Sequence, residues 1–286
     1  MYGKSPVTFP QRIVCLSAEH VEICYALGAG DRVVGVPGTA HRPLEARDKP
    51  KVGGFTTFKV DRILALEPDL VLAFSDLQAD IAAELIRAGR PVFCTNPRSM
   101  DEILQSILMV GGVLGADAAA RALVADMHDE INQVREFSTM WPDRPRVYFE
   151  EWHEPLIAGI RWVSEVIELA GGRDVFAELR DRRSARERVV DAAEVARRDP
   201  QIILVSWCGK PADLDLVRGR PGWAASARCA RAACTKWTRP RCSVPVPLCS
   251  SGCGPCTSWC SRPFATTTES RRDPECRASK AWTYLR

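Results

Sequence analysis

Four aromatic residues lie at or next to the ends of apolar segments, where their side chains could contact a ligand. Phe74 and Trp207 end two apolar runs, Trp152 follows a third, and Trp162 begins the segment after it. Aromatic faces at the ends of strands suit a large, flat, partly apolar ligand. We therefore predict that all four line a binding cleft, against the alternative that they are ordinary core aromatics.

Polar residues accompany these aromatic positions in the sequence. We predict that the following complete the binding site: Ser75, Asp76, Glu151 and Arg161. Arg161 could grip a carboxylate or phosphate of the ligand with two hydrogen bonds, or it could be a solvated surface arginine. His20 is a further candidate for ligand contact. Its place at the start of a helix, after a Ser17 N-cap, favours the alternative that it is exposed to water.

A metal site and a catalytic site are both disfavoured. The cluster EEWHE at residues 150–154 offers carboxylates and an imidazole, which are suitable metal ligands. Alternate residues of a strand face opposite sides, however, so at most Glu151 and His153 share a face. No P-loop, GxSxG or HExxH motif occurs. Cys208 could be a nucleophile, but a small buried cysteine is the favoured interpretation. We predict no catalytic residues, no bound metal and no catalytic cofactor.

The elements that must position these residues alternate between strands and helices. Apolar runs at 12–16, 32–36, 69–74 and 92–94 are separated by segments of helical periodicity, which predicts a parallel α/β sheet. Residues 116–138 hold no turn residues and carry an apolar stripe with helical spacing: Leu123, Met127, Ile131 and Val134. The pattern of strands and helices then restarts at Arg146.

That restart indicates an internal repeat. Glu67-Pro68-Asp69 leads into LVLAF in the first half, and Asp199-Pro200-Gln201 leads into IILVSW in the second. The fold class that we predict is α/β, with two lobes that contain parallel sheets and are joined by a single long linker helix. The predicted boundaries are 1–115 for the first lobe, 116–140 for the linker helix and 141–225 for the second lobe. A cleft between the lobes is the expected binding site, because parallel strands present ligands at their carboxyl ends.

Three segments carry a resemblance to a known family: RIVCLSAEHVEICYALGAGDRVVGV, VGGFTTFKVDRILALEPDLVLAFSD and RVYFEEWHEPLIAGIRWVSEVIELAGGRDVF. In this order and spacing they resemble the Fe/B12-type periplasmic binding proteins of ABC importers, and most of all the members called cobalamin-binding. The resemblance covers about residues 12–225. It implies a large ligand, a corrinoid or a ferric chelate, that is held between two lobes for delivery to an ABC permease. It also implies aromatic contacts at Phe74 and Trp152.

Composition sets further limits. The net charge of +3 is too small to indicate nucleic acid or a membrane surface as a partner, and we expect a monomer. The residues before Arg12 show no signal peptide, and no apolar run is long enough to span a membrane. The chain as given is therefore expected in the cytoplasm, whereas members of the family are usually exported.

The segment 226–286 differs from the rest of the chain, because it is dominated by Cys, Arg, Pro, Ser and Thr. Of the 12 cysteines, four precede residue 226, which leaves eight in this segment. Four of them have a spacing similar to that of metal ligands: Cys249, Cys253, Cys256 and Cys260. The residues around them show no helix or strand pattern, which an ordered zinc site would need. We wrote possible codons for this segment and read them one base earlier. In that frame, residues 226–248 can encode a strand and an RPGP turn, and residues 249–260 can encode an amphipathic helix. We predict a frameshift near Ser226, a disordered tail and no zinc.

Three hypotheses for function remain open at this point. The favoured one is a solute-binding protein for a cobalamin-like or iron-chelate ligand that delivers its ligand to an importer. The second is a cytosolic protein that binds or handles corrinoids without a role in transport, which the missing signal peptide suggests. The third is an enzyme that acts in the cleft between the lobes.

Overall fold

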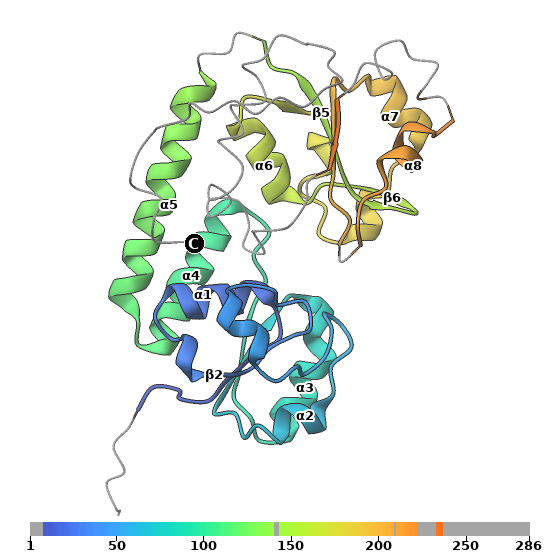
Figure 1. The fold of residues 1–286 in the computed structure, drawn as a ribbon. Coiled ribbons are helices and arrows are strands. Elements are labelled where there is room, and N and C mark those ends of the chain that lie inside the picture. The colour runs from blue at the N-terminus through green and yellow to red at the C-terminus, as the bar shows by residue number, and fades with distance from the viewer. Residues whose placement is uncertain (1–7, 140–142, 209, 222, 224–232, 237–286) are drawn as a thin grey trace, which may run out of the picture.

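Two α/β lobes make up the protein, as a computed structural model shows (Figure 1). The structure describes residues 8–139, 143–208, 210–221, 223 and 233–236. Helix α5, Asp117–Ser138, runs along one side of the molecule from the first lobe to the second (Figure 1). The predicted fold class, with two lobes and one long connecting helix, is therefore confirmed. Within the described residues no helix is both long and apolar enough to cross a membrane.

The first lobe holds a four-stranded sheet in which every neighbouring pair is parallel, in the order β2-β1-β3-β4. Its strands are β1 Ile13–Cys15, β2 Val33–Gly35, β3 Leu70–Phe74 and β4 Val92–Thr95. Its helices are α1 Ala18–Ala26, α2 Val60–Leu64, α3 Ala79–Arg87 and α4 Met100–Leu114.

Both faces of this sheet are covered. Ile13 and Cys15 of β1 belong to one apolar cluster, which also contains buried residues of α1, α4 and α5. Val14 lies in a second cluster, on the opposite face, with residues of α2 and α3. A strand that is buried on both faces needs a continuous apolar run rather than an alternating one. This requirement explains why the apolar run RIVCL correctly predicted a strand that is buried on both faces.

The second lobe has a five-stranded sheet, with β6, β5, β8 and β9 in order and β7 paired to β5. Its strands are β5 Arg146–His153, β6 Leu156–Ala158, β7 Arg173–Asp174, β8 Ile202–Val205 and β9 Ala233–Lys236. Its helices are α6 Arg161–Leu169, α7 Ala192–Arg198 and α8 Leu214–Arg218. Strand β6 runs antiparallel to β5, so this sheet is mixed and not purely parallel as predicted. The short connection between β5 and β6 explains the difference, because two adjacent strands joined by a tight turn must be antiparallel.

The internal repeat is visible in individual hydrogen bonds. The peptide N–H of Asp69 donates to the carbonyl of Arg12 at 3.0 Å, and that of Gln201 donates to the carbonyl of Arg146 at 2.8 Å. The guanidinium of each arginine also donates to a carbonyl in the turn before the paired parallel strand, β3 for Arg12 and β8 for Arg146. In both turns the residue before proline has a positive φ, 46° at Glu67 and 50° at Asp199. The two lobes therefore share a local construction as well as a sequence pattern.

The tail requires one correction. We expected residues 226–286 to be disordered and to leave the edge of β8 unpaired, but β9 pairs with β8 in parallel over four residues. Main-chain N–H and C=O groups on a free edge can bind a segment of almost any sequence. The remaining residues of the segment, including the four cysteines with a metal-like spacing, lie outside the described residues. The lobe boundaries stay a prediction.

Candidate functional site

Two half-buried phenylalanines lie side by side in the first lobe. Phe74 is the last residue of β3, and its ring centroid is 6.2 Å from that of Phe55, which lies in the loop between β2 and α2. The amide of Gln78 fixes both backbones, because its Nε2 donates to the carbonyl of Phe55 and its Oε1 accepts from the N–H of Phe74. The pair presents aromatic surface at the carboxyl end of the sheet, where the sequence predicted Phe74.

His20 stands behind this surface and is only 1% exposed. Its Nδ1 lies 3.0 Å from Ser17 Oγ and its Nε2 lies 3.1 Å from Thr95 Oγ1, while its ring meets Phe74 edge-on at 6.3 Å. Burial lowers its pKa from 6.5 to about 4, so the ring is neutral at pH 7. The expectation that His20 is exposed to water is wrong, because the hydroxyl of Thr95, on the fourth strand of the sheet, draws the ring into the core.

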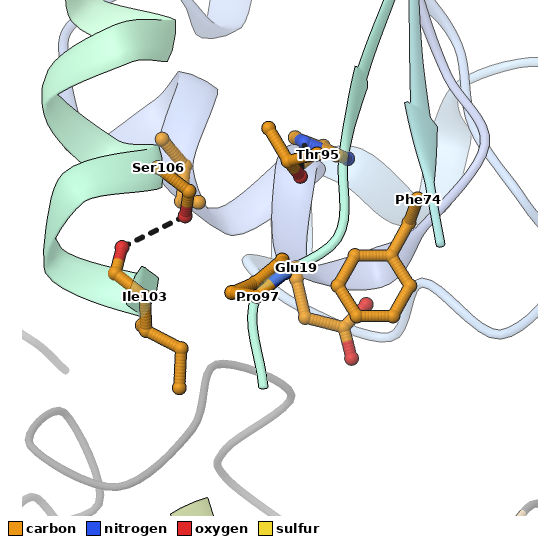
Figure 2. A pocket seen from close by; sticks show the side chains of 8 residues that line it. Glu19, Phe74, Thr95, Pro97, Ile103 and Ser106 are labelled. Atoms are coloured by element: carbon orange, nitrogen blue, oxygen red, sulfur yellow. Dashed lines mark hydrogen bonds between the residues drawn. The ribbon is translucent and has the colours of Figure 1, made fainter. Parts of the chain in front are cut away.

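A small cavity lies between His20, Phe74 and helix α4 (Figure 2). Its lining residues are Glu19, His20, Ile23, Phe74, Thr95, Pro97, Ile103 and Ser106. Its volume is about 20 Å³, which is room for roughly one water molecule. A ligand with a large ring would therefore lie outside this cavity, against the exposed side of Phe74.

The two polar residues after Phe74 have different surroundings. Ser75 is buried with a φ of 64°, and its hydroxyl accepts from the N–H of Leu77. Ser75 therefore stabilises the turn that follows β3, and its hydroxyl oxygen is already used in this hydrogen bond. Asp76 is exposed, and its Oδ1 lies 2.7 Å from the guanidinium of Arg98, which makes an ion pair at the surface of the lobe.

In the second lobe, Trp152 is a half-buried aromatic residue of strand β5. It lies within β5, not after it as predicted, because β6 prolongs the pairing of β5 to His153. Its indole Nε1 donates to the carbonyl of Glu154 at 3.0 Å, and part of its ring packs on the core of the lobe. The ring also lies against that of His153, with centroids 5.0 Å apart, and contact of Trp152 with a ligand stays a prediction.

Trp207 occupies a different environment from the one predicted. It follows β8, is only 3% exposed and donates from its Nε1 to Oε1 of Glu150 at 2.9 Å. Glu150 is fully buried and forms a bidentate ion pair with Arg220. Trp207 is thus part of the core, since the buried carboxylate needs its N–H as a hydrogen-bond donor. It does not line an open cleft in this structure.

The charged side chains of the EEWHE segment contact different partners and do not form one cluster. Glu151 pairs with Arg188, whose side chain is only 2% exposed. His153 stacks on Trp207 with centroids 4.2 Å apart, and its Nε2 lies 3.0 Å from Nζ of Lys210. Among the residues that the structure describes, no group of three or more metal-ligating side chains is found. Cys208 is exposed, so the expectation of a buried thiol is wrong.

Arg161 and Trp162 lie in the first turn of α6, where the two lobes meet. The Arg161 side chain is 45% exposed and pairs with Glu165 at 2.8 Å and with Asp181 at 3.6 Å. Trp162 is half-buried and packs against the core clusters of both lobes. Its peptide N–H donates to the carbonyl of Arg98 in the first lobe at 2.9 Å. The predicted site residues Asp76, Arg161 and Trp162 are therefore neighbours of one interlobe contact.

Sequence reasoning missed three residues of this region. Phe55 could have been found, because it stands in the VGGFTTF segment among the motifs that carry the family resemblance. Arg188 and Arg220 gave no such signal, since each lies in a segment without periodicity and reaches a strand far away in the sequence. Their roles become evident only when the fold brings them to the carboxylates of β5.

Comparisons with known proteins agree on one kind of protein. A family model described as "Periplasmic binding protein" matches residues 13–228. Over 200 residues the chain is 27% identical to the vitamin B12-binding protein of Vibrio parahaemolyticus, with 68% of this chain and 70% of that protein covered.

Two solved structures resemble this one. One is a periplasmic heme-binding protein from Roseiflexus sp. RS-1 in its apo form, with a TM-score of 0.67, 26% identity, and coverage of 78% of this chain and 88% of that chain. The other is the periplasmic vitamin B12-binding protein of Vibrio cholerae, with a TM-score of 0.64, 22% identity, and coverage of 80% and 88%. Because the second structure is only 22% identical in sequence, its similarity shows the fold alone.

Proposed function

The chain belongs to the periplasmic binding protein family, whose members bind solutes and do not catalyse reactions, and on that premise we propose that it binds a cobalamin-like or iron-chelate ligand between its lobes and delivers it to an ABC importer. The single observation that carries the choice of ligand is the pair of aromatic surfaces at the strand ends of the two lobes. Phe74 and Phe55 supply one, and Trp152 supplies the other.

These aromatic surfaces suit a flat macrocycle better than a small polar solute. Ring faces gain from stacking and from apolar burial, neither of which a sugar or an amino acid would exploit fully. The charged side chains of Asp76, Arg98 and Arg161 could hydrogen-bond to amide or carboxylate groups on the rim of such a ring. The named relatives bind vitamin B12 and heme, which are macrocycles of this shape.

A titration of the purified protein with three probes tests the proposal. Cyanocobalamin, hemin and a ferric siderophore are each added while tryptophan fluorescence is followed, because Trp152 and Trp162 report on the region concerned. We expect one probe to saturate at one molecule per chain and to be recovered chemically unchanged. The absence of saturation with all three probes, or the recovery of a modified ligand, contradicts the proposal.

A further inference from the structure

The first turn of α4 has an acceptor that comes from the other lobe. Ser99 is its N-cap, and Glu102 accepts from the N–H groups of Arg98 and Ser99 in a capping box. The next N–H, that of Met100, donates to Oε2 of Glu165 at 2.7 Å. Glu165 belongs to α6 in the second lobe. The N–H groups at the start of a helix have no partner within it, so this carboxylate satisfies a donor that its own lobe leaves unpaired.

A second hydrogen bond crosses between the same two turns in the opposite direction. The N–H of Trp162 in α6 donates to the carbonyl of Arg98, just before α4, at 2.9 Å. The side chain of Trp162 packs against a core cluster of each lobe. Each helix start thus gives one donor and receives one acceptor, and an apolar contact lies alongside.

Charge strengthens the contact at Glu165. Its Oε1 is held by Nε of Arg161 at 2.8 Å, which leaves Oε2 directed at Met100. A carboxylate at the N-terminus of a helix also interacts favourably with the positive end of the helix dipole, and α4 is 15 residues long. The side chain of Glu165 is 24% exposed, so solvent screens this interaction only in part.

We propose that these two helix starts form a second interlobe junction besides α5, in which Glu165 is the positioning residue that holds the second lobe at a fixed distance from the first. The junction borders the site, because Arg98 pairs with Asp76 and Arg161 pairs with Glu165. Its effect on affinity rests on the proposed function: the aromatic surfaces of Phe74 and Trp152 are presented to the ligand at a preset separation.

Amide hydrogen exchange, measured on the full chain without ligand, tests the junction. In Glu165→Ala the Met100 amide loses a charge-assisted hydrogen bond, so its exchange should accelerate at least about tenfold. The Trp162 amide, which Glu165 does not touch, should accelerate as well, because the lobes separate at both bonds. Glu165→Gln keeps an oxygen acceptor without the charge, and its effect should be intermediate.

Two variants serve as controls. Glu168→Ala removes a carboxylate from the same helix, one that pairs with Arg180 at 3.5 Å within the second lobe, and should leave both amides unchanged. Glu102→Ala should accelerate exchange at Ser99 while Met100 stays protected. Unchanged exchange at Met100 in Glu165→Ala overturns the junction. Acceleration at Met100 alone, with Trp162 unchanged, indicates a local cap and overturns the positioning role.

Binding of cyanocobalamin and hemin provides the second readout. Affinity falls with the fraction of molecules that hold the binding geometry, so Glu165→Ala should weaken it about fivefold or more, and Glu168→Ala should not. Equal affinity in Glu165→Ala and the parent protein overturns the preset separation. If neither probe binds the parent protein while the exchange results hold, the proposed ligand class fails and the junction stands.

Discussion

The two lobes repeat one construction, yet they hold their polar interior groups in different ways. In the first lobe the buried titratable ring, His20, is neutral and is held by two hydroxyl groups. In the second lobe β5 carries two carboxylates, and each pairs with an arginine whose side chain is 10% exposed or less: Glu150 with Arg220 and Glu151 with Arg188. The first lobe therefore depends mainly on apolar burial and neutral hydrogen bonds, with a partly exposed ion pair between Glu22 and Arg42, whereas the second lobe holds a carboxylate, Glu150, that is fully buried against an arginine.

This difference follows from how the segments of each lobe are attached. Regular helices cover both faces of the first sheet, so apolar side chains alone can close it. In the second lobe the segments around 185–188 and 206–221 contain only short helical turns. The arginines that they contribute fasten them to β5. A buried ion pair of this kind gives direction to a segment that has little apolar surface with which to orient itself.

The largest effect should come from the tail of the second lobe. We proposed that the segment after Ser226 is out of frame. Restoring the frame would replace the sequence of the strand that pairs with β8 and add an amphipathic helix, and covering about 200 Å² of apolar surface would stabilise the lobe by about 5 kcal/mol. Urea denaturation of the restored and parent chains measures this. Resequencing the gene is the direct check, and relatives that carry the same cysteine-rich tail would exclude a frameshift.

A slightly smaller effect is expected from breaking the buried pair of the second lobe. Arg220→Met leaves Glu150 buried without its cation, which should lower the free energy of unfolding by about 3–5 kcal/mol. Arg218→Met removes an arginine that is 57% exposed and pairs with Asp215 at 3.2 Å, so it should cost less than about 1 kcal/mol. Equal losses in the two variants, measured by urea denaturation, would show that the second lobe does not depend on its buried ion pair.

The first lobe should show a dependence on pH that comes from His20. Its folded-state pKa of about 4 lies below the ordinary 6.5, so between these values the unfolded chain binds a proton that the folded chain does not. The stability attributable to this group is fully present above pH 6.5 and falls as the pH drops towards 4, by about 3 kcal/mol in all.

His20→Gln should flatten this part of the curve of unfolding free energy against pH. The matched control is His128→Gln, since His128 is an exposed residue of α5, and this variant should keep the slope of the parent protein. A parent protein whose stability does not change between pH 6.5 and 4 would show that the ring is not held in its neutral form.

The smallest effects concern ligand binding, where the two lobes should act alike. Loss of one stacked aromatic costs about 1–3 kcal/mol for bases on aromatic side chains, and we expect a similar scale here. Phe74→Ala and Trp152→Ala should therefore each weaken binding about 5- to 100-fold, as measured by fluorescence titration. Affinity that stays the same in both variants would exclude the proposed site.

Much of the fold could be predicted because its causes are local. Runs such as RIVCL and DLVLAF must be buried on both faces, and the two turns that contain Pro68 and Pro200 occur in equivalent places. The apolar stripe from Leu123 to Val134 predicted α5, because its helical spacing is also a local property of the sequence. Strand β6 was missed, because three residues after a tight turn carry too short a pattern to be recognised.

The site could be predicted only in part. Phe74 and Trp152 were predicted from their positions near strand ends and are half-buried in the structure, while their contact with a ligand stays a prediction. Trp207 shares that kind of position but is buried, because its N–H binds a carboxylate that is itself held by Arg220. His20 is buried for a similar reason, since Thr95 lies 75 residues further along the chain. Contacts over such separations in sequence leave no periodic signal.

Helix α5 has a consequence for the rate at which a ligand is captured. Its 22 residues form a strut about 33 Å long, which can bend only slightly and which acts together with the junction at Glu165 to limit how far one lobe moves relative to the other. Capture then needs no slow closing step before or after the encounter. The observed association rate should rise in proportion to ligand concentration without reaching a plateau, and differences in affinity among ligands should reside in how slowly each one escapes.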